Sequence, residues 1–328
     1  MSSSYQSNFN IKENKDGSYK LTSTVKIDKI YLSERSTKIN YFDIYEPFYA
    51  KVSKIKGIFR NKTLSKKKIY FEFADFEDSF ISEYKIHTLL FPNDIKPHEK
   101  LYYEYKQSYS DIAFLPIIYI PNIDLVRSCQ IIFEHPEDHL VEFEFFFPRD
   151  TIPYTINTSD RKKTILTFEN IKELKPINYI PFNEFHAAIL VTLRKNDNLV
   201  NPTSVPQFME WYGKLINLSP ALGETYHNIL AEKFSTAGNE IQKLEIIHDF
   251  VRNNIRYIAD EQSMYAFIPR QPDYILDHSY GDCKDRAYLS SALAARENLN
   301  VNMALVSTEP CPPFKGVHVL QFNHVICA

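Results

Sequence analysis

The sequence predicts a multidomain protein in which an N-terminal antiparallel β-sandwich-like domain precedes an α+β domain. Two patterns carry this prediction: apolar residues recur with period two from residue 19 to about 193, and at helical spacing after residue 206. The length of 328 residues leaves room for two cores. We place the first domain at 1–194, a connection at 195–206 and the second domain at 207–328.

Alternation in the first half is typical of strands that bury one face. Tyr19, Leu21 and Ile27 share one parity and follow a turn signal at 14–17. Sheets with one apolar face are commonly buried against each other in a sandwich. The same alternation recurs at Leu101, Tyr103 and Tyr105 and at Phe143, Phe145 and Phe147. These aromatic residues are expected to pack in the core, and a tyrosine-rich surface for sugars or peptides is the alternative.

Composition excludes several classes of function. The 38 Lys and Arg against 41 Asp and Glu give a net charge of −3, which leaves no basic excess for nucleic acid. No apolar run is long enough to span a bilayer, and the N-terminus carries no signal peptide. We therefore expect a cytoplasmic protein, or a periplasmic one if a leader is missing. No disulfide framework, metal site or cofactor is expected, because the four cysteines are scattered and the histidines lack ligand spacing.

The second half changes to helical periodicity. The spacing predicts helices over 206–215, 224–234 and 240–254, then a proline-containing loop and a helix that begins at Asp282. Two strands are expected at its end, over 303–307 and 322–326. Helices followed by strands indicate an α+β domain.

The chemistry concentrates at Cys283. Asp282 is a favourable N-cap, and Asp285 three residues later can complete a capping box. Cys283 then occupies the first helical position, where free backbone N–H groups and the helix dipole favour a thiolate. The neighbouring aspartates oppose that shift, so a partner base is needed. The alternative for Cys283 is a small buried apolar residue.

His324 is the candidate base. It lies in an apolar strand, where alternation places Phe322, His324 and Ile326 on one face. A cysteine at a helix start and a histidine on a later strand fit a nucleophile-and-base pair. The alternative for His324 is a core histidine without a catalytic role.

The second half resembles the transglutaminase-like superfamily of papain-like thiol enzymes. The residues that carry this resemblance are 250–257, Pro269, Pro272, 274–276, 281–285 and 322–326. The first half resembles the β-rich domain of unknown function that precedes such domains in bacterial proteins. Its matching residues are 16–18, 91–93, Pro97 and 101–105.

The resemblance implies a Cys–His–Asp triad that cleaves or exchanges amide bonds of a protein or peptide substrate. Cys283 would form a thioester, and His324 would carry the proton to the leaving amine. Gly281, Asp282 and Asp285 would support the nucleophile. The backbone N–H of Cys283 would bind the oxyanion, with Gln271 or Tyr257 as candidates for the second donor.

The third triad member departs from the family pattern, in which the acid lies on the strand after the histidine. The chain ends at Ala328, soon after His324. Three explanations remain: a C-terminally incomplete domain, which we favour, substitution by Asp260 or Glu261, or an inactive protein. The alternative function is therefore a catalytically inactive transglutaminase-like scaffold whose β-domain binds a protein or glycan partner. Substrate, hydrolysis versus transamidation, and oligomeric state stay open.

Overall fold

The computed structural model describes residues 1–73, 81–121, 125–172, 186–217, 220, 222–226, 228–308 and 310–328. Strands take 41% of the chain and helices 24%, so the protein is β-rich with several sheets, as expected. Two compact units form. The β unit holds the described residues within 1–74, 84–205 and 310–319, and the helical unit holds those within 75–83, 206–309 and 320–328. None of the described helices combines the length and apolar character that a membrane crossing requires.

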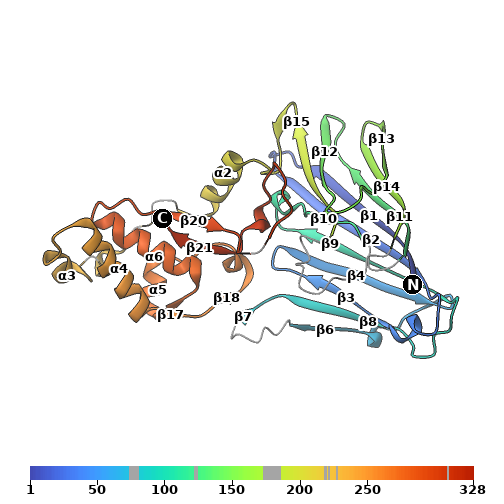
Figure 1. Cartoon of the computed structure of the whole chain (residues 1–328), viewed down its shortest axis with the longest axis horizontal. Helices are drawn as coiled ribbons and strands as arrows, with labels where there is room; N and C mark the ends of the chain where they lie inside the picture. The colour runs from blue at the N-terminus through green and yellow to red at the C-terminus, as the bar shows by residue number, and fades with distance from the viewer. Residues whose placement is uncertain are drawn as a thin grey trace. The chain divides into compact units, whose positions relative to one another are not determined.

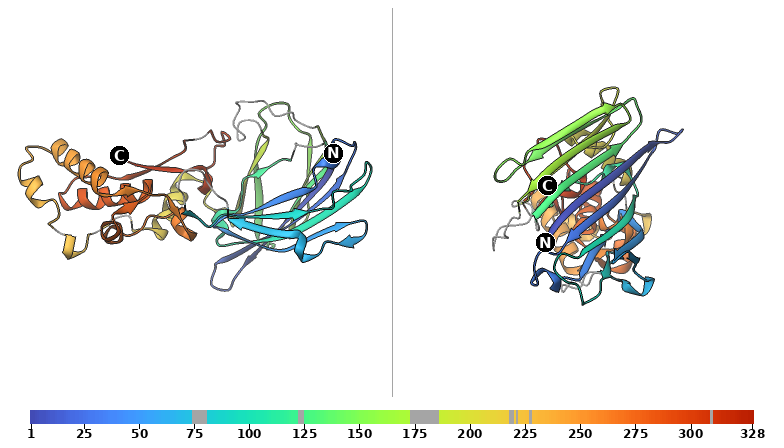
Figure 2. Two further views of the ribbon diagram at one scale, coloured as in Figure 1. Left: turned by 90° about the horizontal axis from the view of Figure 1, so that it is seen from below. Right: turned by 90° about the vertical axis from the view of Figure 1, so that its right-hand side faces the viewer.

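The β unit is built on one twisted sheet of eight strands that lie side by side (Figures 1 and 2). Neighbouring strands are antiparallel except β1 and β11, which are parallel. The expectation of a purely antiparallel domain is wrong at this pair, because β11 reaches β1 through a long connection, which leaves either direction open. In sheet order the strands are β13 (Tyr154–Asp160), β14 (Lys163–Ile171), β11 (Leu125–Glu134), β1 (Ser2–Glu13), β2 (Tyr19–Ile30), β9 (Lys100–Tyr109), β4 (Ala50–Phe59) and β5 (Lys62–Thr63).

The hairpin of β1 and β2 shows how local sequence sets this sheet. Gly17 adopts φ +81°, a left-handed conformation that favours glycine, and the Asn14 N–H donates to the Ser18 carbonyl at 2.8 Å. The strand that follows buries Leu21 and Ile27, which are 1% and 6% exposed. The predicted turn and the predicted parity are both confirmed.

Two smaller sheets each close a core against the large sheet, as in a sandwich. In the first core, Phe133 and Phe168 of the large sheet pack with Ile189 of β15. In the second, Leu101 of β9 packs with Leu89 of β8. The first small sheet contains β10 (Ile118–Tyr119), β15 (Ala188–Lys195), β12 (His139–Phe146) and β16 (Asn198–Leu199), and the second contains β3 (Tyr41–Glu46), β8 (Lys85–Leu90) and β6 (Ile69–Phe73).

The segment expected as a connection, 195–206, is packed into the β unit over most of its length. β16 folds back on β15. The buried Asn201 then accepts the Leu193 N–H at 2.8 Å and donates to the Val191 carbonyl at 2.9 Å. Its amide thereby satisfies two backbone groups of β15, which explains why a polar residue is buried here.

The helical unit packs its longer helices around one core. Ile247 and Val251 of α4 meet Ile275 of α5 and Leu289 and Leu293 of α6. Its helices are α2 (Val205–Leu215), α3 (Ala231–Ser235), α4 (Glu240–Asn254), α5 (Pro272–His278) and α6 (Cys283–Arg296). Its paired strands are β17 (Arg256–Tyr257) with β19 (Tyr280–Gly281), β20 (Met303–Val306) with β21 (His324–Cys327), and β18 (Asp260–Glu261) with β7 (Ile81–Ser82).

Two elements of this unit differ from the sequence prediction. The expected helix over 224–234 is a short 3-10 turn followed by the five-residue α3. Here tertiary bonds to α5 hold the chain, since the Gly223 N–H donates to Asp273 at 2.9 Å and the Tyr226 phenol donates to Asp277. The expected loop contains α5, whose Pro272 occupies the first helical turn, where proline is tolerated.

A segment between β20 and β21 belongs to the β unit; we call it the docked segment, residues 310–319. The Gly316 N–H donates to the Glu144 carboxylate at 3.1 Å. The buried His318 ring donates to the Leu115 carbonyl at 2.9 Å. Burial lowers the pKa of His318 to about 4, so the ring is neutral at physiological pH and causes no buried charge.

We expect Gly316→Ala to release the docked segment. A Cβ at this position would lie 2.6 Å from Leu190 Cδ2 and 3.0 Å from the Thr203 carbonyl oxygen. Such overpacking should lower the free energy of unfolding by about 1–3 kcal/mol, measured by urea denaturation, and speed amide hydrogen exchange over 310–319. Lys315→Ala, at the exposed neighbouring side chain, is the control and should change stability by less than about 0.5 kcal/mol. Equal stability of the two variants would contradict this prediction.

Candidate active site

Cys283 is the first residue of α6, and the predicted capping box is present. The Asp282 carboxylate accepts the N–H groups of Lys284 at 3.1 Å and Asp285 at 3.3 Å. The Asp285 carboxylate in turn accepts the Asp282 N–H at 3.2 Å. The start of α6 is therefore fixed from both sides, which fixes the backbone that carries the thiol.

Gly281 is required by the same arrangement. A Cβ at this position would lie 2.6 Å from the Cβ of Asp285, so a larger residue would push the Asp285 side chain off the helix start. Gly281 also pairs with Tyr257 across the parallel β19 and β17. One glycine thus lets the capping box close and places Tyr257 beside the first turn of α6.

A buried ion network supports the helix start from behind. Asp285 has no exposed surface, and Arg270 donates to it from its backbone N–H at 2.8 Å and its guanidinium at 3.1 Å. The same guanidinium pairs with Asp260 at 2.6 Å and lies 4.6 Å from the ring centre of Tyr265. Burial alone would lower the pKa of Arg270, but the carboxylates of Asp285 and Asp260 raise it above its usual value. Arg270 is therefore the counter-ion of two buried acids.

This network uses Asp260, one of the two acids considered as a substitute third triad member. Asp260 pairs with Arg270 and makes no hydrogen bond to His324 within the described part of the chain. The side chain of Glu261, the other candidate, lies outside the described residues. The sequence offered Asp260 as a substitute acid and did not reveal its ion pair with Arg270.

The sulfur of Cys283 lies among groups from three separate elements. The Tyr257 phenol of β17 lies close enough to Cys283 for the thiol to raise the pKa of the phenol. The backbone N–H of Val325 in β21 faces the sulfur and lowers the pKa of the thiol. Tyr212 of α2 is close enough to interact electrostatically with the thiol. Sequence analysis missed Tyr212, although its helical spacing from Phe208 marked an inward face.

Burial and the charge of Asp282 raise the pKa of the Cys283 thiol, while the Val325 N–H and Lys284 act in the opposite direction. The expectation that the helix start lowers this pKa is therefore wrong for this arrangement. The dipole acts on a thiol that is largely removed from water and next to a carboxylate. Burial, Cys283 and Asp282 raise the pKa of Tyr257 to about 12, so its phenol stays a proton donor at physiological pH.

His324 is the first residue of β21 and is half-buried. The face that alternation assigns to His324 and Ile326 is not the more buried one, since Ile326 is 46% exposed, whereas Val325 is 7% exposed and packs inward. Phe322 precedes the strand, and its ring packs on the Phe208 ring with 5.2 Å between the ring centres. β21 pairs with β20 and packs against α6, and Val325 is on the buried face.

The helix that carries Cys283 packs against the strand that carries His324. No hydrogen bond joins the side chains of Cys283 and His324 among the residues that the structure describes. The residue of β21 whose N–H faces the sulfur is Val325, which directly follows His324.

Gln271 does not join this group. It is exposed, and it precedes α5 as an N-cap without a side-chain capping bond. Of the two candidates for the second oxyanion donor, Tyr257 is the one that contacts Cys283.

Among its described residues, the β unit contains a group of side chains with metal-ligand character. Glu13, Asp138 and His139 bring their ligand atoms within 4.8 Å of one another. The Lys195 ammonium contacts both oxygens of Glu13, at 2.6 and 2.7 Å, and Asp138 at 3.6 Å. Lys195 thus supplies the positive charge that this cluster needs.

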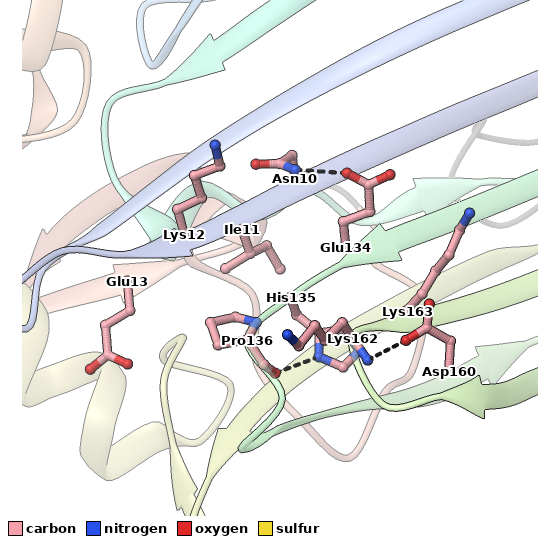
Figure 3. A pocket seen from close by; sticks show the side chains of 10 residues that line it. All are labelled: Asn10, Ile11, Lys12, Glu13, Glu134, His135, Pro136, Asp160, Lys162 and Lys163. Atoms are coloured by element: carbon pink, nitrogen blue, oxygen red, sulfur yellow. Dashed lines mark hydrogen bonds between the residues drawn. The ribbon is translucent and has the colours of Figure 1, made fainter.

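A cavity of about 590 Å³ lies at the ends of β1, β11 and β14 (Figure 3). Its polar side chains bond to neighbouring protein groups. The Asn10 amide donates to Glu134 at 2.7 Å, and the His135 ring donates to the Pro136 carbonyl at 3.0 Å. Acidic and basic side chains alternate around it, so its charge favours neither anions nor cations.

Solved structures include proteins that this chain resembles in fold. A protein from Parabacteroides distasonis, described as a putative protease, aligns with a TM-score of 0.66 at 13% identity. The alignment covers 99% of this chain and 64% of that one, so the chain spans about two thirds of the neighbour's length. At this identity the likeness shows the fold alone.

Two further solved structures align with TM-scores too low to support an argument. They are an M1 zinc metallopeptidase from Deinococcus radiodurans (TM-score 0.28, 9% identity, 58% of this chain and 41% of that one) and a putative nutrient binding protein from Legionella pneumophila (0.29, 8%, 90% and 92%). No family model matches the chain, and no curated protein matches it.

Replacing Arg270 by methionine should strongly destabilise the helical unit. Arg270→Met would leave Asp285 and Asp260 buried without a counter-ion, which costs about 3–5 kcal/mol of unfolding free energy in comparable pairs. Urea denaturation followed by circular dichroism measures the loss. Arg256→Met, at an exposed arginine on β17, is the matched control and should remain within about 0.5 kcal/mol. A similar small change in both variants would show that the network does not support the fold.

Proposed function

We propose that the helical unit is a transglutaminase-like cysteine enzyme core that acts on amide bonds, with Cys283 as nucleophile and His324 as base. The observation that carries this proposal is the position of Cys283 at the start of α6, close enough to the Val325 N–H next to His324 and to the Tyr257 phenol for these groups to interact with its thiol. The neighbour described as a putative protease shares the fold, which supports this proposal.

In the proposed reaction, the thiol proton moves to the His324 imidazole and the sulfur attacks the carbonyl carbon of the amide. The tetrahedral intermediate then collapses, the C–N bond breaks, and the imidazolium gives its proton to the leaving amine. A thioester on Cys283 remains. Water releases a carboxylic acid from it, whereas an amine forms a new amide, so the same intermediate serves hydrolysis and transamidation.

Two donors that could bind the oxyanion converge at this point. The backbone N–H of Cys283 and the phenol of Tyr257 lie close enough to affect each other. A carbonyl oxygen that enters between them would receive both bonds as its negative charge develops. The raised pKa of Tyr257 keeps the phenol protonated for this role.

Activation of the thiol requires a base. Since burial and Asp282 raise the pKa of Cys283, the isolated thiol would be mostly protonated at neutral pH. An imidazolium at His324 would compensate for the charge of the thiolate and offset that penalty.

Alkylation of Cys283 by iodoacetamide tests the proposed pair. We expect Cys283 to react at pH 6 faster than free cysteine, and His324→Gln to abolish this low-pH reactivity. Asp282→Asn keeps an N-cap but removes the charge that raises the pKa, so it should speed the reaction about tenfold for each unit by which the pKa falls. Peptide-level mass spectrometry separates Cys283 from Cys129, where burial raises the pKa to about 12. A Cys283 rate at pH 6 no higher than that of free cysteine would refute the activated pair.

Tyr257→Phe should lower amide turnover without loss of the nucleophile. Removal of one oxyanion donor typically reduces kcat about 10²- to 10³-fold. Ammonia release from glutamine peptides and cleavage of unstructured peptides are the assays, and Cys283→Ala gives the background. Tyr265→Phe is a matched control, because its ring packs on Arg270 rather than on the thiol. Unchanged kcat in Tyr257→Phe would remove this residue from the oxyanion site.

An inactive scaffold is the second candidate function. The observations that favour it are the raised pKa of Cys283 and the lack of a Cys283–His324 bond within the described residues. The alkylation experiment decides between the two, since a scaffold has no reason to keep a thiol reactive at pH 6.

A further inference from the structure

The β unit contains a second cavity of about 590 Å³, which we call the tyrosine cavity. It lies against the face of the large sheet formed by β1, β2 and β9, with β3 and the chain leading into β10 as its other walls. Its volume is in the range of ordinary small-molecule sites. Six tyrosines line it: Tyr45, Tyr49, Tyr84, Tyr105, Tyr109 and Tyr119.

Strand register places the floor of this cavity in two rows. Ser23 is paired with Gln107 in the first row, and Val25 with Tyr105 in the second. Since residues opposite each other on paired strands share a face, these side chains all stand on the cavity side of the sheet. The floor is therefore a rigid surface in which polar and aromatic groups alternate.

The polar groups of the floor are only partly satisfied by the protein. Tyr109 donates to the Gln107 carbonyl oxygen at 3.2 Å, while Ser23 reaches the same oxygen only at 3.5 Å. The Gln107 amide nitrogen reaches the Tyr45 carbonyl at 3.5 Å, the long limit for a hydrogen bond. These groups keep donor and acceptor capacity for a ligand.

Two phenols add to this capacity. Neither Tyr49 nor Tyr105 has a hydrogen bond from its hydroxyl to another described residue. The Tyr49 ring stacks on the Phe114 ring, with 5.0 Å between the ring centres. This stacking holds the Tyr49 hydroxyl in place. Burial raises the pKa of both phenols, and that of Tyr109 to about 12, so all three are neutral at physiological pH.

Charge narrows the class of ligand. No Lys, Arg or His is among the described residues that line the cavity, so phosphates and carboxylates would lack a counter-ion. The one carboxylate, Asp43, already accepts the Thr88 hydroxyl at 2.6 Å on the exposed side of β3. A ligand that stacks on aromatic rings and exchanges hydrogen bonds with hydroxyl and amide groups, without a charge, fits this lining.

We propose that the tyrosine cavity binds a neutral carbohydrate, with Tyr49 and Tyr105 bonding sugar hydroxyls and the aromatic walls packing on the apolar face of a sugar ring. This role is separate from the proposed amide chemistry. It would give the β unit a ligand of its own.

Isothermal titration calorimetry with maltose, cellobiose and N,N′-diacetylchitobiose tests this proposal. The full chain carrying Cys283→Ala is used, so that the result does not depend on amide chemistry. We expect at least one disaccharide to bind saturably, with a Kd below about 10 mM. Tyr49→Phe and Tyr105→Phe remove only a hydroxyl each and should raise its Kd about three- to tenfold. Binding should be constant from pH 6 to 9, because the phenols stay neutral.

Tyr154→Phe is the matched control, since Tyr154 stacks on Phe145 at 4.3 Å and does not line the cavity. Near-ultraviolet circular dichroism verifies that each variant is folded. Lack of binding by all three disaccharides overturns the proposal. An equal rise in Kd in Tyr154→Phe also overturns it. Saturable binding of tetramethylammonium instead would assign the rings to cation recognition and also overturn it.

Discussion

The buried carboxylate of Asp285 is the interaction on which the candidate site depends. It caps the backbone of Asp282, and it is held in turn by the backbone and guanidinium of Arg270. Gly281 is the only residue small enough to let it lie there, because even a Cβ would collide with it. A fully buried charge is unfavourable unless it is paired and hydrogen-bonded, and Asp285 meets both conditions. The result is a helix start that cannot shift without breaking several bonds at once, and the nucleophile is carried by that helix start.

The carboxylates that stabilise this helix start also make ionisation of the Cys283 thiol less favourable. Asp282 secures the first turn of α6, but its charge raises the pKa of the neighbouring Cys283. A helix start that is stabilised by carboxylates therefore cannot also activate a thiolate by its dipole alone. A reactive thiol at this position would need an external base, and the proposal assigns that role to His324 of β21. Under this proposal α6 stabilises the position of the thiol, and β21 supplies its reactivity.

Sequence patterns predicted what depends on neighbours along the chain. The capping box, the position of Cys283 and the turn at Gly17 follow from residues within four positions of each other. Contacts between distant segments were not predictable in this way: the parallel pairing of β1 with β11 and the ion pairs of Arg270 each join residues that no local pattern relates. The face that β21 buries also depends on packing rather than alternation, because alternation defines two faces without saying which one meets the helices.

The docked segment extends this reasoning to the strand of the candidate base. β20 and β21 pair as neighbours, yet the chain that joins them runs through the β unit, where Gly316 and His318 are bonded to Glu144 and Leu115. A hairpin with a free loop would leave the start of β21 held only by its own ladder. Here the chain enters β21 from a segment that is itself fixed by buried hydrogen bonds, and His324 is the first residue of that strand.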